Sequence, residues 1–261
     1  MLFFEKNNCG YLLKTIFYLF SKVKNGDAEI AMIPVDNTVA GRVSDIYHLL
    51  PQGELFIIGE RYQPIHHQLM AIKSAKLGDI KVARSHPMAL GQVRKRLSGL
   101  NITAMADVDT AAAARKVAER GDPTVAAVAS KLAAEKYGLE ILMSDIEDET
   151  HNTTRFLVLS QTPQIPDAAD GPVVSSYVFK VRSVPSALYK ALGGFASNGL
   201  NLTKLESYMV GGKFTATQFY ADIEGHPDDP AVARALEELD YFTDYMHLMG
   251  VYPSAARRHE R

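Results

Sequence analysis

A proline-rich segment separates two stretches of the chain that follow different orders of secondary structure. Residues 160–172, SQTPQIPDAADGP, hold three prolines and a glycine and almost no residue that could pack into a core. Such a composition is typical of a linker. Because 261 residues suit one large or two ordinary domains, we predict one domain over residues 1–160, a linker over 161–172 and a second domain over 173–261.

Short apolar runs alternate with helical patterns before this linker. The expected strands are 28–34, ending at a proline, 54–62, 66–72, 80–85 and 124–130, and the expected helices are 87–100, 109–120 and 131–139. Pro87 suits the first turn of a helix, Asp109 or Thr110 an N-cap, and Gly121 a C-terminal end. Strands that alternate with helices predict an α/β domain with a mostly parallel sheet.

The order of elements changes after the linker. The expected elements are strand 173–182, helix 186–200, strand 201–210, a hairpin turn at GGK, strand 214–225, helix 229–242 and strand 245–253. This βαββαβ order is the ferredoxin-like plan, in which an antiparallel sheet carries both helices on one face. We therefore expect an α/β region followed by a ferredoxin-like domain.

The overall charge gives no reason to expect nucleic acid or a membrane as a partner. The formal net charge is −2 and the isoelectric point is near 6.4. The single cysteine, Cys9, excludes a disulfide within the chain and fits a reducing compartment, so we expect a cytoplasmic protein. The apolar run 12–20 is too short to span a bilayer, and Glu5 before it is unlike a signal peptide. We expect this run to form a helix that enters the fold.

Polar residues follow two of the expected strands. Asp36, Asn37 and Thr38 come after strand 28–34, and Ser85 ends another strand, with Gln92 on the helix that follows. In α/β folds, free backbone N–H groups at such points bind anions and small ligands. A plainer interpretation also stands, with Asn37 or Thr38 as a helix cap and Gln92 as a solvated helix residue.

A third polar group precedes the apolar run LVLS. The string NTTRF, residues 152–156, places two hydroxyls and a guanidinium at the entry of an expected strand, and a guanidinium suits a carboxylate. An ordinary loop is the alternative. The pair His66 and His67 has no Cys or Glu at helical spacing, so we expect no metal, and His67 is better assigned to hydrogen bonding in the wall of a site.

Sequence motifs for several other chemistries are missing. The chain contains no G-x-G-x-x-G, Walker loop, G-x-S-x-G or HExxH, which weakens assignment as a nucleotide-binding protein, a serine hydrolase or a zinc protease. Uncharged donors with one arginine and no strong nucleophile indicate a site that binds an anion. Such a site lowers a barrier through orientation and electrostatics.

The sequence resembles the prephenate dehydratase family. The matching strings are PVDNTVAG, ERYQPIHHQL, SHPMALGQ, the run from YGLEIL to IEDETHNTTRF, and a second part similar to an ACT regulatory domain. The resemblance implies two α/β lobes folded like periplasmic solute-binding proteins, with the active site in the cleft between them, followed by the ACT domain. It also implies the decarboxylating dehydration of prephenate to phenylpyruvate in L-phenylalanine biosynthesis, without a cofactor.

The resemblance also implies roles for the polar residues. Thr154 would be catalytic and would donate a hydrogen bond or a proton to the departing hydroxyl. Arg155 would hold a substrate carboxylate or brace the site from behind, and Thr110 would offer its hydroxyl and amide to a carboxylate. The other substrate-binding residues that it implies are Asp36, Asn37, Thr38, Ser85, Gln92 and Phe156.

In the second part, VPSALYKAL and LESYMV resemble the effector motifs of the family. They imply L-phenylalanine as an effector and a homodimer or homotetramer, since such domains bind effectors between subunits. Backbone amides at the start of a helix would hold the amino-acid carboxylate. The effector residues implied are Ser186, Ala187, Leu188, Asn198, Glu206 and Ser207, with ordinary packing of helix on sheet as the alternative.

The chain departs from the family pattern at named positions. Asp36 stands in place of Glu, Met88 in place of Gln, Ser186 in place of Gly, and Tyr208 and Met209 in place of Arg and Pro. The opening MLFFEKNNCGYLLKTI lacks the family's glycine-rich turn after a first strand. Either these residues supply a strand, or the protein is an altered version with weak activity. An amino-acid-binding protein without turnover, an arogenate dehydratase and a solute-binding protein therefore remain as alternatives.

Overall fold

The chain forms two compact units, each built from segments that lie far apart in the sequence. The computed structural model describes residues 2–4, 10–12, 16–42, 50–52, 54–209 and 218–259, so Cys9 and the expected GGK turn lie outside the described residues. The first unit combines Met1–Val35, Arg42–Tyr62 and Arg155–Arg261, and the second combines Asp36–Gly41 and Gln63–Thr154.

One sheet of the first unit is six-stranded and has the order β2-β1-β3-β11-β5, with β4 paired to β3. Its strands are β1 (Leu2–Phe4), β2 (Gly10–Leu12), β3 (Ile30–Asn37), β4 (Gly41–Arg42), β5 (Phe56–Pro64) and β11 (Thr153–Ser160). The predicted end of a strand at Pro34 is wrong, because β3 continues to Asn37. Proline lacks only its own N–H, and buried Ile33 and Val35 continue the alternation on either side of it.

The first residues of the chain form a strand, which is one of the two alternatives that the sequence left open for this region. β1 pairs antiparallel with β3 and places Phe3 opposite Ala31. The helix expected over residues 12–20 forms only in part, as α1 (Ile16–Lys24), because Leu12 belongs to β2. Leu19 and Val23, one turn apart in α1, are buried. Neither α1 nor any other helix in the described ranges combines the length and apolar character needed to cross a membrane.

The sheet of the second unit has the order β10-β6-β9-β7-β8. Its strands are β6 (Gln68–Ala71), β7 (Val82–Ser85), β8 (Thr103–Ala106), β9 (Val125–Ala129) and β10 (Glu140–Met143). β7 is parallel to β8 and β9, whereas β6 is antiparallel to β9 and β10. Four of these five strands therefore share one direction, which confirms a mostly parallel sheet here. The prediction of parallel pairing is wrong for β1, which is antiparallel to β2 and β3. Residues 5–9, which join β1 to β2, are too few for the crossover connection that a parallel pair needs.

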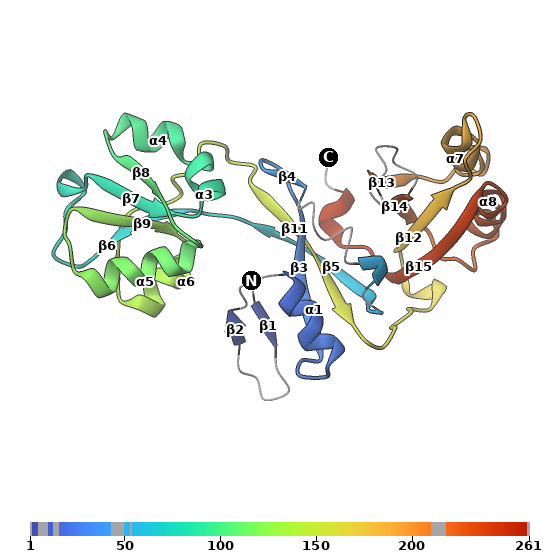
Figure 1. Ribbon diagram of the computed structural model, residues 1–261, viewed down its shortest axis with the longest axis horizontal. Coiled ribbons are helices and arrows are strands. Elements are labelled where there is room, and N and C mark those ends of the chain that lie inside the picture. The colour runs from blue at the N-terminus through green and yellow to red at the C-terminus, as the bar shows by residue number, and fades with distance from the viewer. Residues whose placement is uncertain are drawn as a thin grey trace. The chain divides into compact units, whose positions relative to one another are not determined.

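Helices cover both faces of this second sheet (Figure 1). They are α3 (Pro87–Gln92), α4 (Arg94–Gly99), α5 (Thr110–Arg120) and α6 (Lys131–Tyr137). Alternate residues of β9 face the two sides: Ala126 and Val128 share a core with α3 and α4, and Ala127 and Ala129 share another with α5 and α6. The sheet is thus buried between two layers of helices.

The helix predicted in one piece at 87–100 divides at Val93 into α3 and α4, so that prediction is wrong. Val93 has φ −120° and ψ 14°, which is not helical. The carboxylate of Asp148 accepts hydrogen bonds from two backbone amides in the first turn of α4. It therefore caps α4 from a distant part of the chain. Gln92 becomes the last residue of α3.

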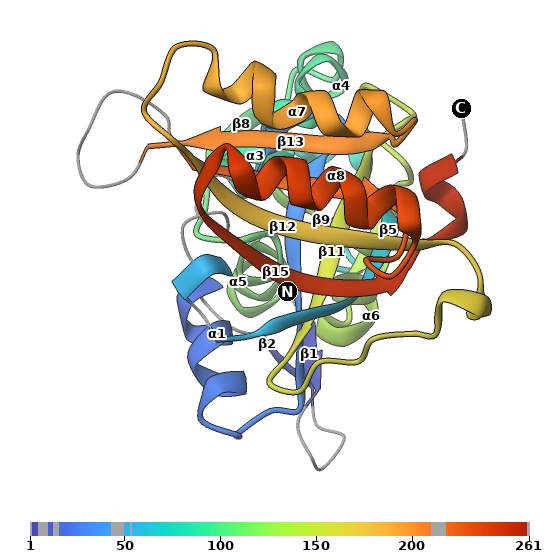
Figure 2. The ribbon, with the colours of Figure 1, turned by 90° about the vertical axis from the view of Figure 1, so that its right-hand side faces the viewer.

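The C-terminal part of the first unit is a four-stranded antiparallel sheet with the order β13-β14-β12-β15. Its elements are β12 (Val173–Val181), α7 (Ala187–Ser197), β13 (Leu202–Tyr208), β14 (Gln218–Glu224), α8 (Pro230–Tyr241) and β15 (Thr243–Pro253). Both helices lie on one face of this sheet (Figure 2), where they share a core with Tyr177 and Phe179 of β12. This arrangement confirms the ferredoxin-like plan. Short 3-10 helices at Leu50–Gln52, Leu77–Asp79, Ala168–Asp170 and Ala256–His259 complete the described elements.

The other face of the ferredoxin-like sheet packs on the six-stranded sheet within the first unit. Val174 and Val178 of β12 share one core with Ile33 of β3 and Ile57 of β5. β15 comes so close to β5 that a Cβ atom at Gly250 would lie 2.0 Å from the carbonyl oxygen of Ile57. Glycine is therefore required at this contact.

We expect Gly250→Ala to lower the free energy of unfolding by about 3 kcal/mol, the upper range for overpacking, since the added methyl group meets backbone rather than a movable side chain. Urea unfolding measures the change. Gly193→Ala in α7 is the control, because its Cβ would meet nothing within 4 Å and alanine stabilises a helix by up to about 1 kcal/mol. Equal stability of Gly250→Ala and the parent would contradict the close approach of β15 to β5.

Candidate functional site

Asn37 lies at the end of β3, where its side chain closes a turn on the next residues. Its Oδ1 accepts hydrogen bonds from the backbone amides of Val39 (3.0 Å) and Ala40 (2.7 Å). A backbone amide can only donate, so these two bonds decide which atom of the Asn37 side-chain amide is the oxygen. The NH₂ group must therefore be the part that meets β11.

The NH₂ group of Asn37 holds the entry of β11. It donates to Oδ1 of Asn152 (2.8 Å), to Oγ1 of Thr154 (2.9 Å) and, at greater length, to the carbonyl of Thr153 (3.3 Å). Thr154 is only 9% exposed. Its hydroxyl oxygen accepts from Asn37, and no acceptor for its own proton is found among the described residues. The Thr154 proton is therefore available to a ligand.

Gln92 completes a closed group of side-chain amides. The NH₂ group of Asn152 donates to Oε1 of Gln92 (3.0 Å), and the NH₂ group of Gln92 donates to Oδ1 of Asn37 (3.3 Å). Nε2 of His67 lies 2.7 Å from the same Gln92 oxygen, so His67 carries a proton on Nε2. This agrees with the expected hydrogen-bonding role of His67. We call Asn37, Gln92, Asn152 and Thr154 the amide cluster.

The amide cluster is oriented before any ligand arrives. Each member holds the next, and the sequence of bonds begins at backbone amides that cannot rotate. His67 and Asn152 are 6% and 3% exposed, so the bonds lie in a poorly solvated region where they are stronger than in water. Fixed dipoles of this kind stabilise charge that develops in a reaction without having to reorient.

Thr38 has a role that the sequence did not predict. Its hydroxyl donates to the carbonyl of His151 (2.5 Å) and accepts from the amide of Thr153 (2.9 Å), and its own amide donates to the Thr153 carbonyl (3.0 Å). The hydroxyl is thus engaged with the backbone. Thr38 joins the turn after β3 to the start of β11, and the structure does not leave its hydroxyl free for a ligand.

Ser85 and Thr110 lie apart from the amide cluster. The Ser85 hydroxyl is fully buried and donates to the carbonyl of Val128 in the neighbouring strand (2.6 Å). Thr110 is the first residue of α5, half-buried, and Asp109 caps that helix. Among the described residues, neither hydroxyl bonds to the amide cluster. Two further predicted residues are half-buried, Asp36 in β3 and Phe156 in β11.

A cavity of about 410 Å³ lies beside the amide cluster in the second unit. Gln92 forms part of its wall together with Arg94 and Asp148, and its other lining residues are Val39, Gly91, Lys95 and Glu149. The wall therefore contains two cationic side chains, Arg94 and Lys95, and two carboxylates, Asp148 and Glu149, of which Glu149 lies 3.5 Å from Lys95. A small polar ligand fits this lining.

Arg155 follows Thr154 in the chain but belongs to the first unit, where it is 6% exposed. Its guanidinium lies 2.9 Å from a carboxylate oxygen of Glu60, 2.7 Å from one of Asp222, and 3.2 Å from the hydroxyl of Tyr252. These groups come from β5, β14 and β15. Of the two roles that the resemblance implied for Arg155, this geometry favours bracing over a direct hold on substrate.

Arg258 completes the buried charge group around Arg155. It contacts Glu60 at 2.6 Å and Asp222 at 3.3 Å. Burial by itself raises the pKa of both carboxyl groups. The positive charges of Arg155 and Arg258 outweigh burial at Asp222 and hold its pKa below its usual range. At Glu60, the hydrogen bond from Arg258 and the charge of Arg155 do the same. All four side chains are thus charged, and they bind the six-stranded sheet to the ferredoxin-like sheet.

Similarity to known proteins gives the family of this chain. The family model described as "Prephenate dehydratase" matches residues 1–164. The chain belongs to the prephenate dehydratase family. A bifunctional N-acyl-homoserine lactone acylase/prephenate dehydratase of Komagataeibacter europaeus is 46% identical over 94% of this chain and 87% of its own length. An arogenate dehydratase/prephenate dehydratase 1 of Arabidopsis thaliana is 37% identical over 85% of this chain and 60% of its own length.

Solved structures extend the similarity to most of the chain. A structure described as GqqA, a novel type of quorum quenching acylase, has a TM-score of 0.88 and 45% identity, and the match covers 95% of this chain and 90% of that one. The prephenate dehydratase of Arthrobacter aurescens in complex with L-Phe has a TM-score of 0.84 and 31% identity, with 95% and 82% covered. Members of this family therefore share the fold over both parts of the chain.

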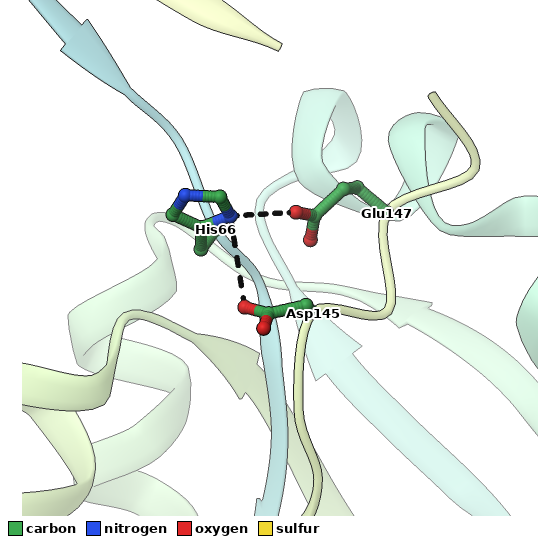
Figure 3. A group of neighbouring side chains, drawn as sticks. All are labelled: His66, Asp145 and Glu147. Atoms are coloured by element: carbon green, nitrogen blue, oxygen red, sulfur yellow. Dashed lines mark hydrogen bonds and ion pairs between the residues drawn. The ribbon is translucent and has the colours of Figure 1, made fainter. Parts of the chain in front are cut away.

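A second polar group consists of the side chains of His66, Asp145 and Glu147, which point toward one another (Figure 3). Nδ1 of His66 lies 2.8 Å from Glu147 and 3.6 Å from Asp145. The three residues offer side-chain atoms within 4.8 Å of one another that could hold a metal ion. The other oxygen of Glu147 accepts from the backbone amide of His67 (2.9 Å). Burial by itself raises the pKa of Glu147, but this bond and the one from His66 outweigh it and hold the pKa below its usual range. The sequence did not predict these partners, because Glu147 lies 81 positions from His66.

The predicted effector residues at the start of α7 are partly engaged with the protein itself. The amide of Ala187 donates to the carbonyl of Val184 (3.2 Å), so the prediction of a free amide there is wrong. A tight turn before the helix supplies that acceptor, and Ser186 within it has φ +61°. Ser186 is exposed, whereas Leu188 is half-buried and packs on the core of the ferredoxin-like sheet.

The other predicted effector residues differ in what they contact. Asn198 donates to the carbonyl of Gly194 (2.8 Å) and accepts from Nε of Arg234 (2.9 Å), which joins α7 to α8. The carboxylate of Glu206 contacts Lys204 (2.7 Å) and Arg42 (2.9 Å). Ser207 is exposed on β13. Asn198 and Glu206 therefore have structural partners already.

Proposed function

We propose that the protein is a prephenate dehydratase. In the reaction, the carbon–carbon bond to the ring carboxylate breaks and releases carbon dioxide, and its electron pair moves through the ring. The bond from carbon to the ring hydroxyl breaks at the same time, and the departing oxygen takes up a proton and leaves as water. The product is phenylpyruvate, whose ring is aromatic. The observation that carries the proposal is the Thr154 hydroxyl, held by Asn37 with its proton unused.

Thr154 is the proposed catalytic residue. The bond from Asn37 occupies its oxygen, so its proton must point away from Asn37 and can be given to the leaving hydroxyl. A threonine is a weak acid, and we therefore assign much of the driving force to aromatisation of the ring. The protein contributes geometry, since the amide cluster fixes the donor before the substrate binds.

The substrate is proposed to lie against Gln92 and Asn37, with a carboxylate near Arg94 in the wall of the 410 Å³ cavity. Phe156, Asp36, Ser85 and Thr110 remain proposed members of the substrate-binding region. Arg155 is proposed to brace β11 immediately after Thr154. No cofactor is proposed, because loss of carbon dioxide and water leaves no change of oxidation state to be balanced from outside.

A turnover assay on the purified chain tests the proposal. Phenylpyruvate absorbs strongly in alkali, so its formation from prephenate can be followed directly. A parallel assay with arogenate separates the two activities. Arogenate carries an amine where prephenate has a ketone, so its product is L-phenylalanine, which is measured by chromatography. Plant relatives are named for arogenate dehydratase alone or for both activities. If neither substrate is converted, while L-phenylalanine still binds in calorimetry, the protein is an amino-acid-binding member of the family.

The ferredoxin-like domain is proposed to be an ACT domain that binds L-phenylalanine in a homodimer or homotetramer. The relative from Arthrobacter aurescens was solved with L-Phe. Exposed Ser186 and Ser207 and half-buried Leu188 are the proposed contacts best placed to meet a ligand. Turnover measured with and without L-phenylalanine, together with the mass in solution, tests this proposal. Unchanged kinetics and no binding heat would exclude it.

Hydrolysis of N-acyl-homoserine lactones is a second candidate function. The observation that favours it is the 46% identity, over 94% of this chain, to a relative named for both activities. The hydroxyls of Thr38, Ser85 and Thr154 bond to amide and carbonyl groups, which is not the environment of an activated nucleophile. Release of a fatty acid and homoserine lactone, measured by mass spectrometry, would support acylase activity. Loss of both activities in Thr154→Ala would place them in one site.

A further inference from the structure

Three consecutive residues, Ile146, Glu147 and Asp148, hold both sides of the contact between His67 and Gln92. The amide of Ile146 donates to the carbonyl of His67 (2.9 Å), and the carboxylate of Glu147 accepts from the His67 amide (2.9 Å). The amide of Asp148 donates to the carbonyl of Gln92 (2.7 Å). One short segment therefore sets the backbone positions of both residues.

Asp148 also acts on Gln92 through the helix that follows it. Its carboxylate accepts from the amides of Lys95 (2.9 Å) and Arg96 (3.1 Å), in the first turn of α4. Val93, at the N-cap of α4, has no side chain that could cap these amides. The carboxylate thus supplies the missing cap and stabilises the break in the helix directly after Gln92.

We propose that Asp148 is a positioning residue for Gln92. By holding the Gln92 carbonyl and the start of α4, it directs the Gln92 side chain to Asn37 and Asn152 instead of leaving it on the surface of a continuous helix. Asp148 and Gln92 also line the same cavity, so a shift in one changes the wall at the other. The kinetic consequence rests on the proposed dehydratase function, and the structural consequence does not.

A double-mutant cycle with prephenate tests the proposal. We expect Asp148→Ala to lower kcat/KM by about tenfold or more, mainly through a higher KM, because misplaced binding groups weaken productive binding. In the Gln92→Ala background the same change should alter kcat/KM by less than about twofold, since residues that act through one another are not additive. Asp148→Asn keeps one acceptor oxygen and should recover most of the loss.

Asp122→Ala is the matched control. The Asp122 carboxylate also accepts a hydrogen bond from a backbone amide, that of Thr124 (2.8 Å). This turn lies outside the amide cluster and the cavity. We expect it to lower thermal stability without changing KM. Equal losses from Asp148→Ala in the parent and in the Gln92→Ala background would show a purely structural role and overturn the proposal.

A second measurement is independent of turnover. In Asp148→Ala, we expect faster hydrogen exchange at the amides of Lys95 and Arg96 and a shift of the Gln92 side-chain NH₂ resonances in NMR spectra, and in Asp122→Ala we expect neither. If the parent converts no prephenate, the proposed function fails, and these spectra alone decide the role of Asp148. Unchanged Gln92 resonances in Asp148→Ala would overturn it.

Discussion

Thr154→Ala is expected to lower kcat for prephenate by about 10³-fold, in the range for loss of a general acid, with little change in thermal stability. The residue offers the only hydroxyl proton of the amide cluster, and alanine removes both this proton and the hydroxyl oxygen that accepts from Asn37. The other contacts of Asn37, to Asn152 and to the backbone, persist in the variant and keep the site folded. Phenylpyruvate formation in steady state measures the change.

Two further variants at this position distinguish the proton from the shape of the side chain. Thr154→Ser keeps a hydroxyl and should retain a substantial part of kcat, whereas Thr154→Val keeps the volume without a proton and should behave like alanine. Thr103→Ala, at an exposed position on β8, is the control and should keep the kcat of the parent. Full activity in both Thr154→Ala and Thr154→Val would remove Thr154 from its proposed role.

Two candidate residues could be placed from the sequence because each stands beside an apolar run. Asn37 follows an apolar run and Thr154 precedes one, and the two residues meet because β3 and β11 are neighbours in one sheet. The same patterns predicted the ferredoxin-like order, because alternating strands and capped helices are encoded locally. Asn152 stood in the NTTRF string but was not assigned, since its partner Gln92 lies 60 positions away.

Side-chain partners that depend on strand register or distant segments could not be predicted. The Ser85 hydroxyl reaches the Val128 carbonyl because β7 pairs with β9 in one particular register. The break after Gln92 depends on a carboxylate 52 to 53 positions away, and nothing local to 87–100 signals it. β8 was not expected, because its four residues are exposed and show no apolar alternation.

Arg155→Met is expected to lower the free energy of unfolding by about 3–5 kcal/mol, the range for removing one partner of a buried ion pair. The substitution leaves Glu60 and Asp222, both buried, with Arg258 as the remaining cation paired with them among the described residues. Urea unfolding at neutral pH measures the loss. Arg42→Met is the control, since the Arg42–Glu206 pair has a similar distance but a half-exposed arginine, and such pairs contribute at most about 1 kcal/mol.

The same variant separates the two roles that the family resemblance left open for Arg155. A residue that holds a substrate carboxylate would raise KM strongly on substitution and leave stability nearly unchanged. If Arg155 braces β11 through Glu60 and Asp222, its substitution should lower the stability of the protein. Activity should then fall through kcat, because Thr154 directly precedes Arg155 in the strand. Arg155→Lys keeps the charge but not the planar fork that reaches two carboxylates, so it should restore only part of the stability. A stable Arg155→Met variant with a raised KM would indicate that Arg155 binds the substrate carboxylate. The buried charge group would then contribute little to the free energy of unfolding.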